Sequence, residues 1–169
     1  MEPLKVLIMD LDNTIYPVSS IGDKLFAPLF ELFEKHGIDK EVMPLLKAEV
    51  MRRPFQYIAN DFKLSDELKA ASDDLLSNLR YPEPMTFFKG YEVIRNFKLK
   101  KYLVTTGYTV MQESKVEQLQ IGGDFDEIII IDPRKDSFGK YEVFQRIQQQ
   151  EGLDANEILV VGDDPQSEL

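Results

Sequence analysis

Two aspartates, Asp10 and Asp12, follow a short apolar run and are separated by a single residue. Residues 5–9 are apolar after the first position and predict a strand covered on both faces, as in a parallel sheet. Because residues i and i+2 of an extended segment point to the same side, both carboxylates are expected together at the carboxyl edge of this strand. Neighbouring anions repel each other unless a cation or a shared proton relieves them. The spacing therefore predicts chemistry at this edge rather than packing.

A polar turn, Thr105-Thr106-Gly107, follows a second apolar run. Its hydroxyl and backbone N–H groups are suited to binding phosphate oxygens, because a helix-like stretch begins directly after it. Thr109 and Gln112 have the spacing of a capping box, which predicts the start of that helix. Taken alone, the turn is more typical of an ordinary connection between a strand and a helix.

A lysine and a second acidic pair complete the set of candidate residues. Lys140 begins a helix-like stretch, and Lys135 is the alternative cation if that helix is misplaced. Asp163 and Asp164 follow the last apolar run, where they are also typical of a turn or a helix N-cap. The order of these residues favours chemistry, because all of them fall where strands end or helices begin, around one edge of a sheet.

The elements that must position these residues alternate between strand and helix. Four strand-like runs occur, and helix-like stretches separate the last three of them. This alternation predicts an α/β fold with a Rossmann-like, doubly wound parallel sheet. The runs comprise residues 5–10, 101–106, 127–132 and 157–162.

About ninety residues separate the first two runs, far more than one crossover connection requires. Apolar residues recur there at helical spacing, and Pro28 and Pro54 predict a kink or the start of a helix. We therefore expect residues 17–84 to form a helical cap over the active edge, inserted into a core of residues 1–16 and 85–169. The alternative is a helical excursion that packs on the core and has no role at the site.

Composition limits the classes of partner. The chain has 169 residues, of which 43% are hydrophobic, and a net charge of −10. This charge argues against binding to nucleic acid or to an anionic membrane, although a metal and a lysine can reverse it locally at a phosphate. The absence of cysteine excludes disulfides, thiolate metal sites and cysteine nucleophiles. No apolar run is long enough for a signal peptide or a membrane span, so a cytoplasmic protein is expected.

The carboxyl end of the sequence leads to a separate expectation. Residues 162–169 are typical of a loop that opens a helix, and the sequence stops there. A parallel strand at the edge of a sheet is exposed when it lacks its covering helix. We therefore expect the core to be incomplete at its carboxyl end.

Taken together, these residues resemble the motifs of the haloacid dehalogenase-like (HAD) hydrolase superfamily. Residues 10–14 resemble its first motif, Thr105 its second, Lys140 its third and Asp163 its fourth. The helical stretch occupies the position of that family's cap, between the first and second motifs, and the resemblance extends over nearly the whole chain. It implies a Mg²⁺-dependent phosphomonoester hydrolase that acts on a small phosphorylated metabolite through an aspartyl-phosphate intermediate.

The resemblance also implies a role for each residue. Asp10 would attack phosphorus, while Asp12 would protonate the leaving oxygen and later take a proton from the attacking water. Asp10, Asp163 and the backbone carbonyl of Asp12 would hold Mg²⁺. Residues 105–107 would hold the transferring oxygens, and Lys140 would neutralise the charge that builds on them.

Some features depart from the family pattern or refine it. Thr106 stands where an asparagine is common, and either Asp164 or Glu168 can take the outer acidic position. Dehalogenases of the superfamily lack the second aspartate of the first motif, so the presence of Asp12 points to phosphoryl transfer. Residues 10–17 resemble most closely those members that act on nucleoside monophosphates.

Three alternatives stay open at this stage. A phosphomutase uses the same aspartates and Mg²⁺ but returns the phosphoryl group to its substrate. A phospho-receiver domain also places acids, a threonine and a lysine on a parallel sheet, but its phosphorylated aspartate follows the third strand. A catalytically silent binding domain is favoured if the chain end is native and leaves the site incomplete.

Overall fold

The computed structural model describes residues 3–165. Within that part of the chain the strands form one parallel sheet in the order β3-β2-β1-β4. All four predicted runs are confirmed as strands, and because they are parallel their carboxyl ends lie along one edge. The strands are β1 (Val6–Met9), β2 (Lys100–Thr106), β3 (Glu127–Ile131) and β4 (Ile158–Val161).

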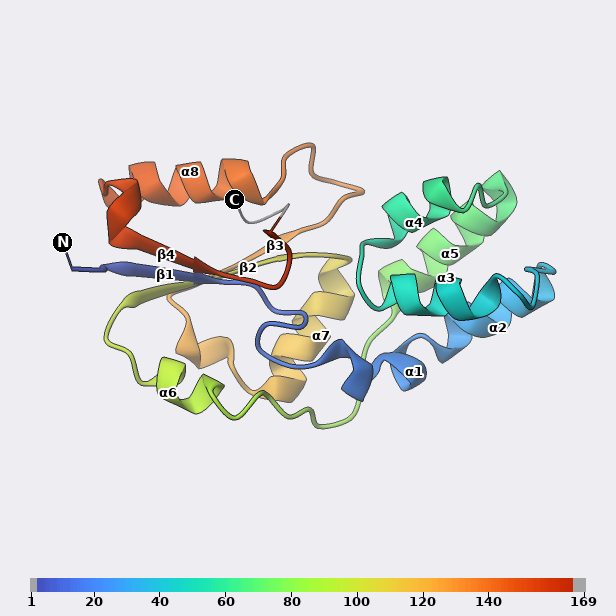
Figure 1. Cartoon of the computed structure of the whole chain (residues 1–169), viewed down its shortest axis with the longest axis horizontal. Coiled ribbons are helices and arrows are strands. Elements are labelled where there is room, and N and C mark those ends of the chain that lie inside the picture. Colours follow the sequence, from blue (N-terminus) through green and yellow to red (C-terminus); the bar gives the residue numbers. More distant parts are fainter. Residues whose placement is uncertain (1–2, 166–169) are drawn as a thin grey trace.

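Helices cover both faces of the sheet (Figure 1). Alternate residues of β1 point to opposite faces, so Leu7 belongs to the apolar cluster that includes α7 (Thr109–Leu119). Ile8 belongs to the cluster that includes α8 (Lys140–Glu151). The short helix α6 (Tyr91–Arg95) lies on the same side as α7. The predicted α/β, doubly wound arrangement is therefore confirmed.

The segment between β1 and β2 is helical, as the sequence predicts. In Figure 1 its helices lie beyond the carboxyl ends of the strands, and we call them the cap. They are α1 (Gly22–Leu25), α2 (Ala27–Lys35), α3 (Met43–Val50), α4 (Phe55–Asp61) and α5 (Asp66–Asn78). The exact division of the chain after residues 16 and 84 stays a prediction. Over residues 3–165, no helix is long and apolar enough to cross a membrane.

Prolines and a serine set the ends of the cap helices. Pro28 lies in the first turn of α2, which is separated from α1 by Phe26, so the structure has a helix start where the sequence predicts a kink or a start. Pro54 directly precedes α4. Proline fits these places because the first N–H groups of a helix have no partner within it. Ser65 caps α5, where its side chain accepts a hydrogen bond of 3.2 Å from the N–H of Leu68.

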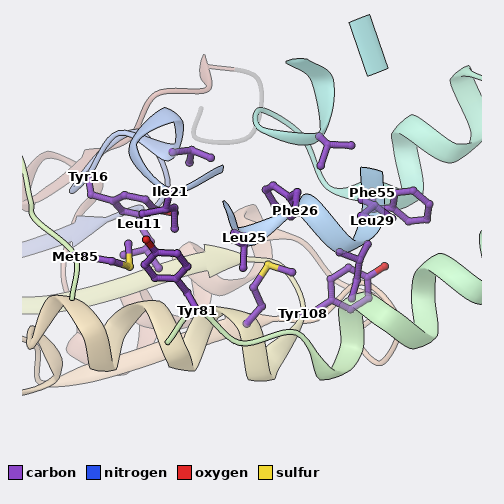
Figure 2. Packing of buried hydrophobic residues seen from close by; sticks show 14 of the residues in the cluster. Leu11, Tyr16, Ile21, Leu25, Phe26, Leu29, Phe55, Tyr81, Met85 and Tyr108 are labelled. Atoms are coloured by element: carbon purple, nitrogen blue, oxygen red, sulfur yellow. The ribbon is translucent and has the colours of Figure 1, made fainter. Parts of the chain in front are cut away.

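One apolar cluster joins the cap to the α7 face of the sheet (Figure 2). It extends from Leu11 and Tyr16, which follow β1, through Leu25 and Phe26 to Phe55 on α4. Tyr16 is fully buried within it. The cap is therefore held against the strand ends by shared burial of apolar surface.

The predicted capping box of α7 is wrong. Tyr108 precedes the helix, and its own side chain makes no capping hydrogen bond. The hydroxyl of Thr109 donates to Asp132 Oδ2 over 3.0 Å, beyond the end of β3. Gln112 is only 1% exposed, and its amide points into the site at the strand ends. Both side chains find their partners in neighbouring elements instead of at the helix terminus.

Candidate active site

A cavity of about 750 Å³ lies between the carboxyl edge of the sheet and the cap. From the cap it is lined chiefly by the end of α3, the connection to α4 and the first turn of α4, residues 50–57. Every candidate residue of the first three motifs lines this cavity, and so do both candidate acids after β4. These residues are Asp10, Asp12, Thr105, Thr106, Gly107, Lys140, Asp163 and Asp164.

Asp10 and Lys140 form a buried ion pair in the wall of the cavity. The N–H of Asp10 donates to the carbonyl of Val161 on β4 over 2.9 Å, which fixes the backbone just after β1. Lys140 is the first residue of α8, and its Nζ lies 2.9 Å from Asp10 Oδ1. The side chain of Asp10 is 8% exposed and that of Lys140 is 7% exposed. Lys135 contacts Asp132 instead, so the structure selects Lys140 as the cation of the site.

Burial shifts the titration of Asp10. It raises the pKa of Asp10 from its ordinary value to about 7, against the opposing effect of Lys140, and the nearby charge of Asp12 raises the pKa further. A carboxylate desolvated in this way is stabilised by any additional cation that approaches it. The position next to Asp10 is therefore suited to a cation.

The raised pKa of Asp10 predicts a pH dependence of stability in the metal-free protein. Between about pH 4 and pH 7 the folded protein binds a proton at Asp10 that the unfolded chain does not bind. The contribution of Asp10 to the free energy of unfolding is therefore expected to fall as the pH rises through this range, by up to about 4 kcal/mol. Urea unfolding in EDTA at a series of pH values measures this slope. The Asp10→Asn variant should lose this contribution, and an unchanged slope in the variant would contradict the assignment.

Asp12 is held by α7, across the sheet from Lys140. The Nζ of Lys115 donates to both carboxylate oxygens of Asp12, over 2.8 and 3.1 Å. Gln112 Nε2 donates to Asp12 Oδ2 over 2.9 Å, and the hydroxyl of Tyr16 donates to Oδ1. Only 3% of the Lys115 side chain is exposed. Within residues 3–165, the carboxylate of Asp12 thus accepts four hydrogen bonds. Two come from the buried Lys115, one from Tyr16 and one from Gln112.

These partners determine the charge of Asp12. Burial alone raises its pKa, but the charge of Lys115 and the hydrogen bonds from Lys115, Tyr16 and Gln112 outweigh burial. The pKa of Asp12 is therefore lowered, and its carboxylate is an anion in this structure.

The expectation that Asp10 and Asp12 lie together at this edge agrees with the structure, because both line the cavity and the charge of Asp12 raises the pKa of Asp10. Both lie at the predicted edge, but their carboxylates bind lysines on α8 and α7, which cover opposite faces of the sheet. β1 ends at Met9, so both aspartates lie just beyond the strand. Asn13 then adopts a left-handed conformation with φ 56°, and its Oδ1 accepts a hydrogen bond from the N–H of Val18, so the chain turns.

Sequence analysis missed Lys115 and Gln112 as site residues. They lie three positions apart and so share one face of α7, which was the available signal. This face could not be assigned from sequence, because the buried positions of α7 mix polar and apolar side chains without a clear stripe.

Gln112 also fixes the polar turn after β2. Its Nε2 donates to Thr105 Oγ1 over 2.7 Å, and both side chains are only 1% exposed. The N–H of Gly107 donates to the carbonyl of Ile131 over 2.9 Å. A Cβ at Gly107 would lie 3.0 Å from the side-chain amide carbon of Gln112, so this close approach favours glycine. Thr106, between Thr105 and Gly107, is half-buried and lines the cavity.

Asp132 is a further residue that sequence analysis did not identify. It is buried at the end of β3, and its carboxylate accepts hydrogen bonds from the N–H and hydroxyl of Thr109 and from Arg134. Burial opposes ionisation, but the hydrogen bonds from Arg134 and Thr109 hold the pKa of Asp132 well below its usual range. Asp132 therefore ties the first residue of α7 to the end of β3.

Tyr108 links the polar turn to the cap. Its hydroxyl accepts a hydrogen bond of 2.9 Å from Gln56 Nε2 on α4 and donates one to Asp73 on α5. The guanidinium of Arg134 lies 5.0 Å from the centre of its ring. Because Tyr108 directly follows Gly107, the cap is attached to the chain next to the turn.

The acids after β4 bear on whether a metal can bind. Asp163 and Asp164 are exposed and line the same cavity as Asp10. Carboxylate oxygens are the ligands that Mg²⁺ prefers, so the chemistry of these donors fits this ion. Among residues 3–165, however, no three acidic or histidine side chains already lie close enough to surround a metal. Glu168, the alternative outer acid, lies outside the described residues.

The parallel sheet, the helices inserted after β1 and the charged cavity at the strand ends define a capped Rossmann-like fold. The sequence pattern of the haloacid dehalogenase-like hydrolases matches residues 7–167 of this chain. The chain therefore belongs to that family, and the resemblance of its motifs is confirmed. No curated protein sequence matches the chain significantly.

Solved structures from several organisms are similar to this one. YfnB from Bacillus subtilis, described as a HAD-hydrolase bound to magnesium, is 16% identical with a TM-score of 0.62, and the match covers 99% of this chain and 83% of that chain. A haloacid dehalogenase-like family protein from Streptococcus pneumoniae is 18% identical with a TM-score of 0.64, covering 96% and 77%. A HAD phosphatase from Thermococcus onnurineus is 21% identical with a TM-score of 0.58, covering 98% and 79%. At these identities the likeness shows the fold.

Proposed function

We propose that this protein is a Mg²⁺-dependent phosphomonoester hydrolase that acts on a small phosphorylated metabolite. The observation that carries the proposal is the buried pair of Asp10 and Lys140, whose charged atoms lie 2.9 Å apart at the end of β1. This pair offers a nucleophilic oxygen and a positive charge for the phosphate oxygens in one place. The HAD phosphatase from Thermococcus onnurineus supports the reaction class as a protein of similar fold.

In the first half-reaction, a carboxylate oxygen of Asp10 forms a bond to phosphorus, and the bond from phosphorus to the leaving oxygen breaks. This yields an aspartyl phosphate and an alcohol, which takes up a proton. Lys140 neutralises the charge on the transferring oxygens. The hydroxyl of Thr105 accepts its hydrogen bond from Gln112, so its own proton is available to a phosphate oxygen. In the second half-reaction, water attacks phosphorus, the bond from phosphorus to the Asp10 oxygen breaks, and inorganic phosphate leaves while the Asp10 carboxylate is restored.

Asp12 carries the proton in this proposal. It gives a proton to the leaving oxygen and then takes one from the attacking water. The structure holds it as an anion against Lys115, which is the form that accepts the proton of water. For the first half-reaction Asp12 carries a proton, which the charge of Lys115 opposes.

Mg²⁺ would be held by the carboxylates of Asp10 and Asp163 and by the backbone carbonyl of Asp12. When bound, the ion offsets the repulsion between the Asp10 carboxylate and an incoming phosphate dianion. The cap, proposed as residues 17–84, encloses the remainder of a small-molecule substrate. Nucleoside monophosphates and sugar phosphates are the substrate classes to be tested first.

Release of inorganic phosphate from 4-nitrophenyl phosphate, sugar phosphates and nucleoside monophosphates tests the proposal. Activity is expected with Mg²⁺, and EDTA is expected to lower it by at least about 100-fold, because the ion contributes several kcal/mol to charge stabilisation. Excess Mg²⁺ should restore the activity. Phosphate release that is insensitive to EDTA would contradict the metal requirement. Transfer between positions of a sugar phosphate without release would identify a phosphomutase instead.

A further inference from the structure

Among residues 3–165, one cationic side chain that lines the cavity has no acidic partner. Four cationic side chains line it, and three of them are already paired with acids. These pairs are Lys140 with Asp10, Lys115 with Asp12, and Arg53 with Asp61. The fourth is Arg52, for which the described part of the chain provides neither an ion pair nor a side-chain hydrogen bond.

Arg52 belongs to the wall of the cavity that the cap provides. It lies in the connection between α3 and α4, whose backbone is fixed because the N–H groups of Arg52 and Arg53 both donate to the carbonyl of Glu49, over 2.9 and 3.0 Å. Asp10 and Lys140, in contrast, belong to the wall formed by the strand ends and α8. The cavity thus has a cation for the reacting phosphate on the core side and, on the cap side, a cation that no acid of residues 3–165 pairs with.

The remaining lining favours an organic ligand body between these two charges. Much of it is apolar and comes from the cap. The apolar side chains include Phe26, Val50, Met51, Phe55, Leu76 and, from α7, Met111. The cavity volume of about 750 Å³ falls within the range of pockets that enclose small organic ligands. A ligand with a phosphate at one end, a carbon skeleton and a second charge therefore matches this lining.

We infer that Arg52 binds a second anionic group, a carboxylate or a phosphate, on the same molecule whose reacting phosphate lies at Asp10 and Lys140. The inference rests on the proposed function and names the class of substrate for it. A guanidinium binds either anion through two parallel hydrogen bonds, which gives it an advantage over a point charge. Phosphomonoesters with a second anion at the correct distance are therefore preferred over neutral ones.

Binding of non-hydrolysable phosphonates in the presence of Mg²⁺ tests this inference by isothermal titration calorimetry. A series of ω-carboxyalkyl phosphonates, lengthened by one methylene at a time, is compared with ω-hydroxyalkyl phosphonates of equal length. At a matching length the carboxylate is expected to bind about 10- to 100-fold more tightly than the alcohol, as for a charged hydrogen bond. Bisphosphonates of the same lengths show whether a carboxylate or a phosphate is the better second group.

Variants separate a direct contact from the general effect of charge. In Arg52→Met the ratio of the two dissociation constants is expected to fall to about one, while Arg52→Lys retains part of the preference. Arg146→Met removes an exposed cation of α8 that does not line the cavity, and it should leave the ratio unchanged. Absence of a preference at every length, or its survival in Arg52→Met, would overturn the inference.

Hydrolysis of the ω-hydroxyalkyl phosphates by the same preparation keeps the two proposals apart. If these neutral esters are hydrolysed but no second anion is preferred, the inference fails and the proposed function stands. If neither hydrolysis nor phosphonate binding is detected with Mg²⁺, both fail together.

Discussion

Replacing Asp10 by asparagine is expected to lower Mg²⁺-dependent phosphate release by at least about 1,000-fold. The amide has nearly the same size as the carboxylate, but it is a poor nucleophile and has no charge to attract Lys140 or a cation. Steady-state kinetics with 4-nitrophenyl phosphate measure the loss. Circular dichroism and thermal unfolding show whether the variant is folded, which makes the loss attributable to chemistry.

Asp61→Asn provides a matched control for this experiment. Asp61 also lines the cavity, but its side chain is 58% exposed and pairs with Arg53 in the cap rather than with Lys140. The control should keep turnover within about threefold of the natural protein, because an exposed charge far from the reacting atoms acts weakly. Turnover of Asp10→Asn close to that of this control would show that a different group attacks phosphorus.

Replacing Lys115 by methionine is expected to lower the free energy of unfolding by about 3 kcal/mol at pH 7. The substitution leaves the Asp12 carboxylate with its hydrogen bonds from Tyr16 and Gln112 but without the cation that offsets its burial. Urea denaturation followed by circular dichroism measures the difference. The double variant Asp12→Asn with Lys115→Met should recover much of the loss, because it removes the buried charge as well.

An exposed ion pair gives the reference for this loss. Arg146 on α8 lies 3.9 Å from Glu127, and its side chain is 53% exposed. Arg146→Met is therefore expected to cost less than about 1 kcal/mol. Equal losses in the Lys115 and Arg146 variants would show that Asp12 does not depend on Lys115 in the folded protein.

The sheet could be predicted because its determinants are local in sequence. A continuous apolar run such as residues 6–9 fits a strand covered on both faces, and alternation with helical stretches leaves a parallel sheet as the simple solution. Parallel strands place their carboxyl ends along one edge, so Asp10, Lys140 and Asp163 could be assigned to a common site before any coordinates were known. The length of the segment between the first two strands, and its helical spacing of apolar residues, likewise predicted an inserted group of helices.

The contacts of Asp12 could not be predicted, because they depend on how distant elements pack. Asp12 and Lys115 are 103 positions apart, and no local pattern indicates which face of α7 meets the first motif. The hydrogen bonds that Gln112 and Tyr16 donate to Asp12 likewise come from segments whose packing the sequence does not indicate. Thr109 and Gln112 show the same limit. Their spacing predicts a capping box, but in the folded protein their side chains donate hydrogen bonds to Asp132 and Asp12.

The side chain of Tyr108 connects the cap to the chain beside the polar turn 105–107. Its hydroxyl is shared by Gln56 and Asp73 of the cap, while its backbone continues directly from Gly107. Both α4 and α5 are therefore bonded to a residue that adjoins the polar turn 105–107. Together with the apolar cluster, these bonds connect the cap to the core directly beside the turn for which we propose phosphate binding.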